Sequence, residues 1–316
     1  MRFRNLLLYH GEGFNPNFYY LSGLTFQNAF LIIKNGKKTI ITNLLNRGLG
    51  RGFQGKFLLS TDLLRDVKRL VRGRTVEIDG RMPVRLYLKL NIKAEDCTEK
   101  LYRMRAQKRL DEVAKIKIAA RLTRSIVDGV SIREGRTEKE IADELLSETY
   151  AQGVEPAFNP IVATGGSAVS PHAIPGNKKI ADYVLIDYGV RYKHYCADIT
   201  RCFFFKTKKG KRVEEIYDKI RDVACRIVDE CAGAKNSGEI TMFYEQLNKK
   251  YGLPKPLHSV GHGIGLEVHE YPRFGKKYND PIKKTTFTIE PAAYFGNFGV
   301  RYEETIFHNG KRLVVL

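Results

Sequence analysis

Alternating apolar runs and turn residues in the first hundred positions predict a small α/β unit. Two β-branched runs, 29–34 and 38–42, flank Asn35-Gly36, a dipeptide that tolerates positive φ and favours a tight hairpin. Apolar residues then recur at helical spacing from Asp62 to Val71, and 75–79 has the character of another strand. We find no group of residues typical of a catalytic site among these elements.

The pattern changes near Arg105, after which two rounds of helix, helix and strands follow. The first round has helices at 110–127 and from Thr137 to Gly153, and strands at 160–164, 183–190 and 198–206. The second has helices at 213–230 and 239–251, and strands near 267–269, 285–290 and 300–307. We therefore predict an α+β protein with a domain at 1–105 and a pseudo-symmetric domain at 106–316, whose helices pack on an antiparallel sheet.

Bulk composition is that of an ordinary globular protein, with 43% hydrophobic and 28% charged residues among 316. No long apolar run occurs, so we expect neither a signal peptide nor a membrane span. The five cysteines form no C-x-x-C pair, which argues against a disulfide framework or a cysteine zinc site and favours a reducing cytoplasm.

The net charge of +19 raises the question of a polyanionic partner. Residues 1–100 contain 18 Lys or Arg against 8 Asp or Glu, so the basic excess is densest there. Nucleic-acid binding is one interpretation. We prefer a solvated basic surface, because the charges are scattered and no arginine-rich tract or recognised nucleic-acid motif accompanies them.

Candidate chemistry begins with two aspartates in apolar surroundings. Asp187 interrupts the run Val184-Leu185-Ile186, and burying a lone carboxylate is costly unless a partner or a metal compensates it. Asp198 follows eleven residues later, and the intervening 191–194 looks like a turn, so a hairpin would bring both carboxylates together. The alternative is that Asp198 merely caps a turn.

Three more potential ligands follow. His262 stands between glycines in Gly261-His262-Gly263, which permits close backbone approach; a phosphate-binding loop is the weaker reading because no Lys-Ser/Thr follows. The metalloprotease motif H-E-x-x-H is absent. Glu290 and Glu303 lie in strand-like runs, and each alone could be a surface carboxylate. Together the four carboxylates would balance two divalent cations, with Mn²⁺ or Fe²⁺ favoured and Co²⁺ or Zn²⁺ also suitable.

Several segments carry a family resemblance: Asp187-x-Gly189, Asp198-x-Thr200-Arg201, 261–269, Thr288-Ile289-Glu290-Pro291 and Arg301-Tyr302-Glu303. They resemble the pita-bread metallopeptidases, the group of methionine aminopeptidase, Xaa-Pro aminopeptidase and Xaa-Pro dipeptidase (prolidase). The resemblance covers most of 105–316. It implies a curved antiparallel sheet covered by helices, and a creatinase/prolidase-type domain before it.

The resemblance also implies roles for individual residues. Asp187, Asp198, His262, Glu290 and Glu303 would hold the two metals, with Glu290 also moving a proton. His172 and His269 match positions that contact the substrate and stabilise the tetrahedral intermediate, while His258 is a candidate neighbour of the ligands. The implied reaction is hydrolysis by a metal-activated hydroxide, in a cytoplasmic homodimer.

The N-terminal third, with Phe18-Tyr19-Tyr20-Leu21-Ser22-Gly23, resembles prolidases and aminopeptidases P rather than methionine aminopeptidase. Arg273 matches an arginine that contacts the C-terminal carboxylate in prolidases, which favours Xaa-Pro dipeptides; the alternative is a surface or interface arginine. Arg301 is a further candidate to contact substrate; the alternative is a mainly structural role. Two other functions stay open, an Xaa-Pro aminopeptidase acting on longer peptides and a non-catalytic protein- or nucleic-acid-binding relative.

Departures from the family pattern leave every ligand in place. Ser167 replaces a common Asn, and Glu304 a common Asp, so the groups that orient the ligands could differ. The first domain is short for the group, which affects the expected dimer contact and the selection of substrate length.

Overall fold

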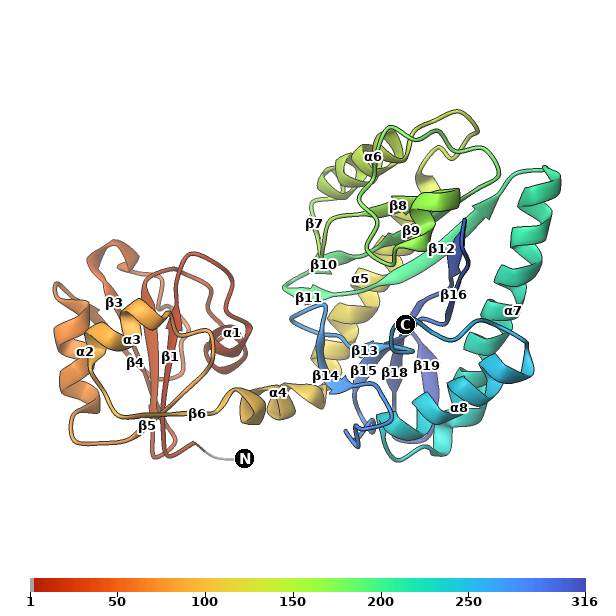
Figure 1. The fold of residues 1–316 in the computed structure, drawn as a ribbon. Helices are drawn as coiled ribbons and strands as arrows, with labels where there is room; N and C mark the ends of the chain where they lie inside the picture. Colours follow the sequence, from red (N-terminus) through yellow and green to blue (C-terminus); the bar gives the residue numbers. More distant parts are fainter. Residues whose placement is uncertain (1–2) are drawn as a thin grey trace. The chain divides into compact units, whose positions relative to one another are not determined.

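The computed structural model describes residues 3–316, which form two compact units (Figure 1). One unit ends at Arg105 and the other runs Ala106–Leu316. No helix in the described part of the chain combines the length and apolarity needed to cross a bilayer. Each unit is described by itself below.

The N-terminal unit is built on one six-stranded sheet in the order β4-β3-β2-β1-β5-β6. The strands are β1 (Asn5–His10), β2 (Ala29–Lys34), β3 (Lys37–Asn43), β4 (Lys56–Ser60), β5 (Val76–Ile78) and β6 (Ala94–Asp96). The hairpin predicted at Asn35-Gly36 is confirmed: β2 and β3 are antiparallel and the two turn residues have φ of 49° and 78°.

Helices cover both faces of this sheet. They are α1 (Pro16–Ser22), α2 (Leu63–Val71), α3 (Val84–Leu90) and α4 (Thr98–Ala106), and the short η1 (Leu44–Asn46) follows β3. Leu6 and Leu8 of β1 pack with Phe18 and Leu101 of α1 and α4. Leu7, which points to the opposite face, packs with α2 and α3. Side chains that alternate along β1 thus pack into two cores, one on each face of the sheet.

The second unit contains four long helices, α5 (Leu110–Gly129), α6 (Glu138–Ala151), α7 (Lys208–Glu230) and α8 (Ser237–Lys250). The capping box predicted at Thr137 and Glu140 is confirmed, with both side-chain bonds present. Helix α7 begins five residues before the expected start at 213, because the hydroxyl of Thr207 accepts a bond from Gly210 N (2.9 Å) and caps it there. Two short turns, η2 (Gly165–Val169) and η3 (Cys231–Gly233), complete the helical elements.

We call the parts of this unit before and after the start of α7 the first and second half-domains. The strands of the first are β7 (Glu155–Pro156), β8 (Ile161–Ala163), β9 (Tyr183–Tyr188), β10 (Val190–Tyr192), β11 (Tyr195–Cys196) and β12 (Ile199–Phe204). Those of the second are β13 (His262–Gly263), β14 (Glu270–Arg273), β15 (Thr286–Ile289), β16 (Ala292–Tyr294), β17 (Gly299–Arg301), β18 (Glu304–His308) and β19 (Leu313–Val315). The main sheets have the orders β12-β9-β8 and β14-β13-β15-β18-β19. The predicted α+β class is confirmed, with helices α5 to α8 around the strands (Figure 1).

Two expected strands were wrong in detail. The segment 267–269 is not a strand, since β14 begins at Glu270. The run 300–307 is divided, because β17 pairs with β16 whereas β18 pairs with β15. The division frees the backbone of Glu303, which forms a bridge with Thr200 of β12. This bridge joins strands of the two half-domains at the candidate site.

Candidate metal centre

Two antiparallel strands position the predicted aspartates. Asp187 lies in β9 and Asp198 immediately precedes β12, whose Thr200 is the register partner of Asp187. The side chains are therefore close although eleven residues separate them in sequence. Glycine is required at position 189, between β9 and β10, since a Cβ there would lie 1.9 Å from the carbonyl oxygen of Ala197. Both aspartates are buried.

The other three candidate ligands come from the second half-domain. His262 lies in β13 between two glycines that permit close packing: a Cβ at Gly261 would lie 2.0 Å from Thr288 O, and one at Gly263 would lie 2.2 Å from Tyr271 C. Glu290 follows β15, where its N–H donates to Val260 O (2.7 Å). The buried Glu303 lies between β17 and β18.

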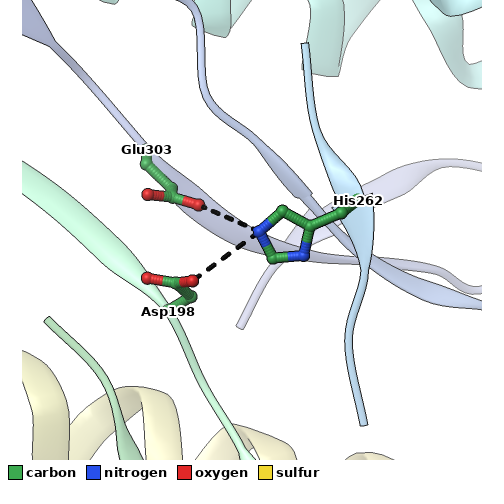
Figure 2. A group of neighbouring side chains, drawn as sticks. All are labelled: Asp198, His262 and Glu303. Carbon is green, nitrogen blue, oxygen red and sulfur yellow. Dashed lines mark ion pairs between the residues drawn. The ribbon is translucent and has the colours of Figure 1, made fainter. Parts of the chain in front are cut away.

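The structure brings these side chains around one imidazole nitrogen. Nε2 of His262 lies 3.7 Å from Oδ2 of Asp198, 3.9 Å from Oε1 of Glu290 and 3.9 Å from Oε1 of Glu303. Figure 2 shows the imidazole facing the carboxylates of Asp198 and Glu303, which come from separate segments of the chain. The ligand atoms of these three residues all lie within 4.8 Å of one another.

Burial disfavours the charged forms of these side chains when no cation is present. Burial and the neighbouring Asp187 raise the pKa of Glu303 to about 8. The pKa of Asp198 is raised by burial and by Glu303, and the pKa of Glu290 is raised for the same two reasons. Burial, with the nearby His269, lowers the pKa of His262 to about 3, so its imidazole is neutral at pH 7.

The donor set fits divalent cations. Oδ1 of Asp187 and Oδ1 of Asp198 are buried without a hydrogen-bond partner among the described residues. Buried acceptors of this kind are costly unless something satisfies them. Carboxylate oxygens with one neutral imidazole are suitable ligands for Mn²⁺, Fe²⁺, Co²⁺ or Zn²⁺.

Sequence reasoning missed the extent to which Arg301 organises this cluster. Its Nη2 donates to Oδ2 of Asp187, its Nε donates to Oγ1 of Thr200 (3.0 Å) and its Nη1 donates to the hydroxyl of Tyr294 (2.9 Å). Thr200 in turn donates to Oε2 of Glu303 (2.7 Å). The β16–β17 pairing holds Arg301 and Tyr294 near each other. Thr200 belongs to the segment Asp198-x-Thr200-Arg201 that carries the family resemblance, whereas Tyr294 carried no signal in the sequence.

Three further histidines surround the cluster. His172, His258 and His269 all line the same cavity as the five candidate ligands. The rings of His262 and His269 have centroids 4.1 Å apart. Nε2 of His258 bonds to Tyr294 (2.9 Å), and its Nδ1 lies 3.6 Å from Oε2 of Glu290. Burial lowers the pKa of His258 to about 4 and also lowers the pKa of His269.

The cavity has a volume of about 640 Å³ and is lined by both polar and apolar residues. The polar ones include the five candidate ligands, the three histidines and Arg301. The apolar ones, which we call the apolar wall, are Phe158, Pro160, Ile161, Pro171, Ala173, Ile174, Pro175 and Val268. Such a cavity suits a small ligand that has a polar reacting group and an apolar body.

A buried glutamate holds the loop that carries His172. Oε1 of Glu138 accepts from Thr164 N (3.0 Å) and from the hydroxyl of Ser167, and its Oε2 accepts from Gly176 N (3.1 Å). Glu138 is the first residue of α6 and is 2% exposed. The departure at Ser167 is thereby explained, because its short side chain reaches Glu138.

Arg273 is placed differently from the other candidates. It is the register partner of His262, but it is not among the residues that line the cavity. Its guanidinium forms a two-point contact with Asp280, at 2.9 Å and 3.2 Å, and lies over the rings of Tyr271 and Tyr278. The carboxylate-binding role expected of Arg273 therefore stays a prediction, and this geometry does not favour it.

Comparisons with known proteins identify a family and agree with the fold. The family model of metallopeptidase family M24 matches residues 114–309. A relative named Xaa-Pro dipeptidase from Pyrococcus horikoshii is 28% identical over 310 residues, covering 92% of this chain and 87% of the relative.

Solved structures give the same result for the fold. The prolidase from Pyrococcus horikoshii superposes with a TM-score of 0.89 at 26% identity, covering 99% of this chain and 93% of that one. An X-Pro aminopeptidase from Thermotoga maritima superposes with a TM-score of 0.88 at 26% identity, covering 99% and 95%. These likenesses confirm the predicted fold and the family resemblance.

Proposed function

Because the chain belongs to metallopeptidase family M24, we propose that it hydrolyses the bond between an N-terminal residue and proline with the help of two divalent cations. One observation carries this proposal. Side chains from both half-domains converge on one cavity, which four carboxylates and His262 line together with the apolar wall. The family membership favours a hydrolase over the non-catalytic alternative.

Asp187, Asp198, His262, Glu290 and Glu303 are the residues that would hold the cations. When bound, divalent cations lower the pKa of water and polarise a carbonyl group, which are the two requirements of peptide hydrolysis at neutral pH. The free α-amino group of a substrate would be placed near the acidic ligands, and the apolar wall would contact the prolyl ring.

The protein's own groups supply the remaining steps. Glu290 lines the cavity beside His262, where its carboxylate would accept a proton and pass it to the departing prolyl nitrogen. His172 and His269 line the cavity, where they would donate hydrogen bonds to the carbonyl oxygen as negative charge develops on it. Arg301 keeps Asp187 in place by donating a hydrogen bond to its carboxylate.

Dipeptides are the first candidate substrates, and longer peptides are the second. The similarity to an Xaa-Pro dipeptidase over most of the chain favours dipeptides. The pairing of Arg273 with Asp280 favours longer peptides, because the clamp expected for a dipeptide carboxylate is already engaged. We further propose that the protein is a homodimer, which light scattering on the purified protein would test. We also propose that it is located in the cytoplasm.

Activity and metal content measured on one sample test the proposal. Protein loaded with Mn²⁺ or Co²⁺ is expected to cleave Ala-Pro or Ala-Pro-Ala, to leave Ala-Ala nearly untouched, and to lose activity on chelation. Faster cleavage of Ala-Pro-Ala than of Ala-Pro would favour the aminopeptidase. A purified protein that neither binds nor responds to any divalent cation would overturn the proposed chemistry.

A further inference from the structure

A second hollow, of about 860 Å³, lies between α8, the segment that follows it and the loop after β14. Its walls include the aromatic side chains of Tyr244, Phe274 and Tyr278. Four lysines also line it: Lys249, Lys255, Lys276 and Lys277. We call this hollow the lysine groove. Glu245 is the one carboxylate among the described residues that line it.

The lysine groove adjoins the candidate metal centre. His258 and Ser259 line both hollows, so a single short segment of backbone forms their common boundary. Nδ1 of His258 lies 3.6 Å from Oε2 of Glu290 on the side of the metal centre. An extended peptide advances about 3.3 to 3.6 Å per residue. Peptide residues that follow the cleaved bond would therefore pass this shared segment to reach the groove.

The two hollows differ in the cations that they can offer a ligand. In the first, Arg301 is committed to Asp187. In the groove, Lys276 pairs with Glu245. Lys249, Lys255 and Lys277 are exposed and form no ion pair with the residues that the structure describes. A negative charge downstream of proline would thus find its cationic partners in the groove.

We propose that the lysine groove binds the C-terminal part of peptides longer than two residues and favours carboxylates at the third and later positions. This inference rests on the proposed cleavage after an N-terminal residue. It names one substrate class, Xaa-Pro peptides with an acidic continuation. The aromatic walls contact the peptide's apolar parts, and the exposed lysines attract its carboxylates.

Matched peptides provide the first test. On metal-loaded protein at low ionic strength, we expect kcat/KM for Ala-Pro-Glu-Glu to exceed that for Ala-Pro-Lys-Lys by about three- to tenfold, the range expected for a few exposed charge pairs. The preference should shrink at high salt because exposed charges are screened. Equal values for the two peptides at low salt would overturn the inference.

Charge-reversed variants locate the effect. Lys255→Glu and Lys277→Glu are each expected to lower the acidic-to-basic preference by about threefold. Lys219→Glu is the matched control, since Lys219 is an exposed residue of α7 that lines neither hollow, and it changes the net charge equally. If Lys219→Glu lowers the preference as much as Lys255→Glu does, the attraction comes from overall charge and the groove is not the site.

Binding without turnover separates this inference from the proposed reaction. Calorimetric titration of Ala-Pro-Glu-Glu into chelator-treated protein is expected to give an affinity about threefold weaker for Lys255→Glu than for Lys219→Glu. That result would support the groove even if no peptide were cleaved, in which case only the proposed function would fail. Equal affinities for the two variants would reject the groove whether or not the enzyme is active.

Discussion

Arg301 and Asp187 form a buried ion pair within the acidic cavity. Nη2 of Arg301 donates to Oδ2 of Asp187, and Oδ1 of the same carboxylate has no hydrogen-bond partner among the described residues. One oxygen is therefore fixed by the protein, and the other is available to a cation. Such outer contacts orient ligands and tune the affinity of a metal site.

Arg301→Lys is expected to weaken metal binding while retaining the positive charge. Lysine cannot reproduce the simultaneous contacts to Asp187, Thr200 and Tyr294. We expect the affinity for Mn²⁺ to fall about 10- to 100-fold, as measured by calorimetry. Arg221→Lys on the exposed face of α7 is the control and should bind Mn²⁺ normally. Normal binding by both variants would contradict the role given to Arg301.

The metal-free chain is expected to lose stability as pH rises toward 8. The pKa of Glu303 is raised in the folded state from 4.5 to about 8 by burial and by Asp187. The folded state therefore holds this proton more tightly than the unfolded state does. The resulting stabilisation is complete below the unfolded pKa and is lost as pH rises through about 8.

Urea unfolding of chelator-treated protein at pH 6 and pH 9 measures this change. Glu303→Gln should show a smaller pH dependence because the titrating group is gone, and it should also bind metal poorly. Saturating Mn²⁺ is expected to reduce the difference in the unmodified chain, since cations offset the repulsion among carboxylates. A metal-free chain that is more stable at pH 9 than at pH 6 would contradict this prediction.

Lys108→Met is expected to destabilise the second unit. Nζ of Lys108 lies 2.8 Å from Oε1 of Glu270, and both side chains are 1% exposed. Removing one member of a buried ion pair typically costs about 3 to 5 kcal/mol, which urea unfolding would detect. Lys115→Met removes a more exposed pair with Asp111 and should cost no more than about 1 kcal/mol. Equal losses in the two variants would show that the burial of the Lys108 pair is unimportant.

Glu138→Gln is expected to impair catalysis through the loop that carries His172. The amide has one acceptor oxygen, whereas the carboxylate accepts bonds from Thr164, Ser167 and Gly176. We expect a stability loss of about 1 to 3 kcal/mol together with a lower kcat, because His172 is held less firmly.

Steady-state kinetics well below the unfolding temperature separate these two effects. Glu148→Gln, an exposed change in the same helix, should leave kcat and KM unaltered. If Glu138→Gln lowers stability but leaves kcat and KM unchanged, Glu138 has only a structural role.

The class of fold and the family of metallopeptidases could be predicted from the sequence. The Asn35-Gly36 hairpin and the Thr137 capping box depend on local backbone preferences, so they could be predicted from neighbouring residues. Asp187 could be singled out because a charge in an apolar run requires compensation. The other candidate ligands were added because together they form a suitable donor set and because the family resemblance implies them. Helix α7 was placed imprecisely, since its start depends on a single side-chain cap at Thr207.

Which groups surround the candidate ligands depends on contacts that form only in the folded chain. The contacts of Arg301 with Asp187 and of Glu138 with Gly176 join residues 114 and 38 positions apart. The pairing of Arg273 with Asp280 could not be predicted from the sequence either, although the two residues are only seven positions apart. A sequence pattern shows that a charge needs a partner, but the choice of partner depends on how the strands and loops meet in space, and no local periodicity encodes that meeting.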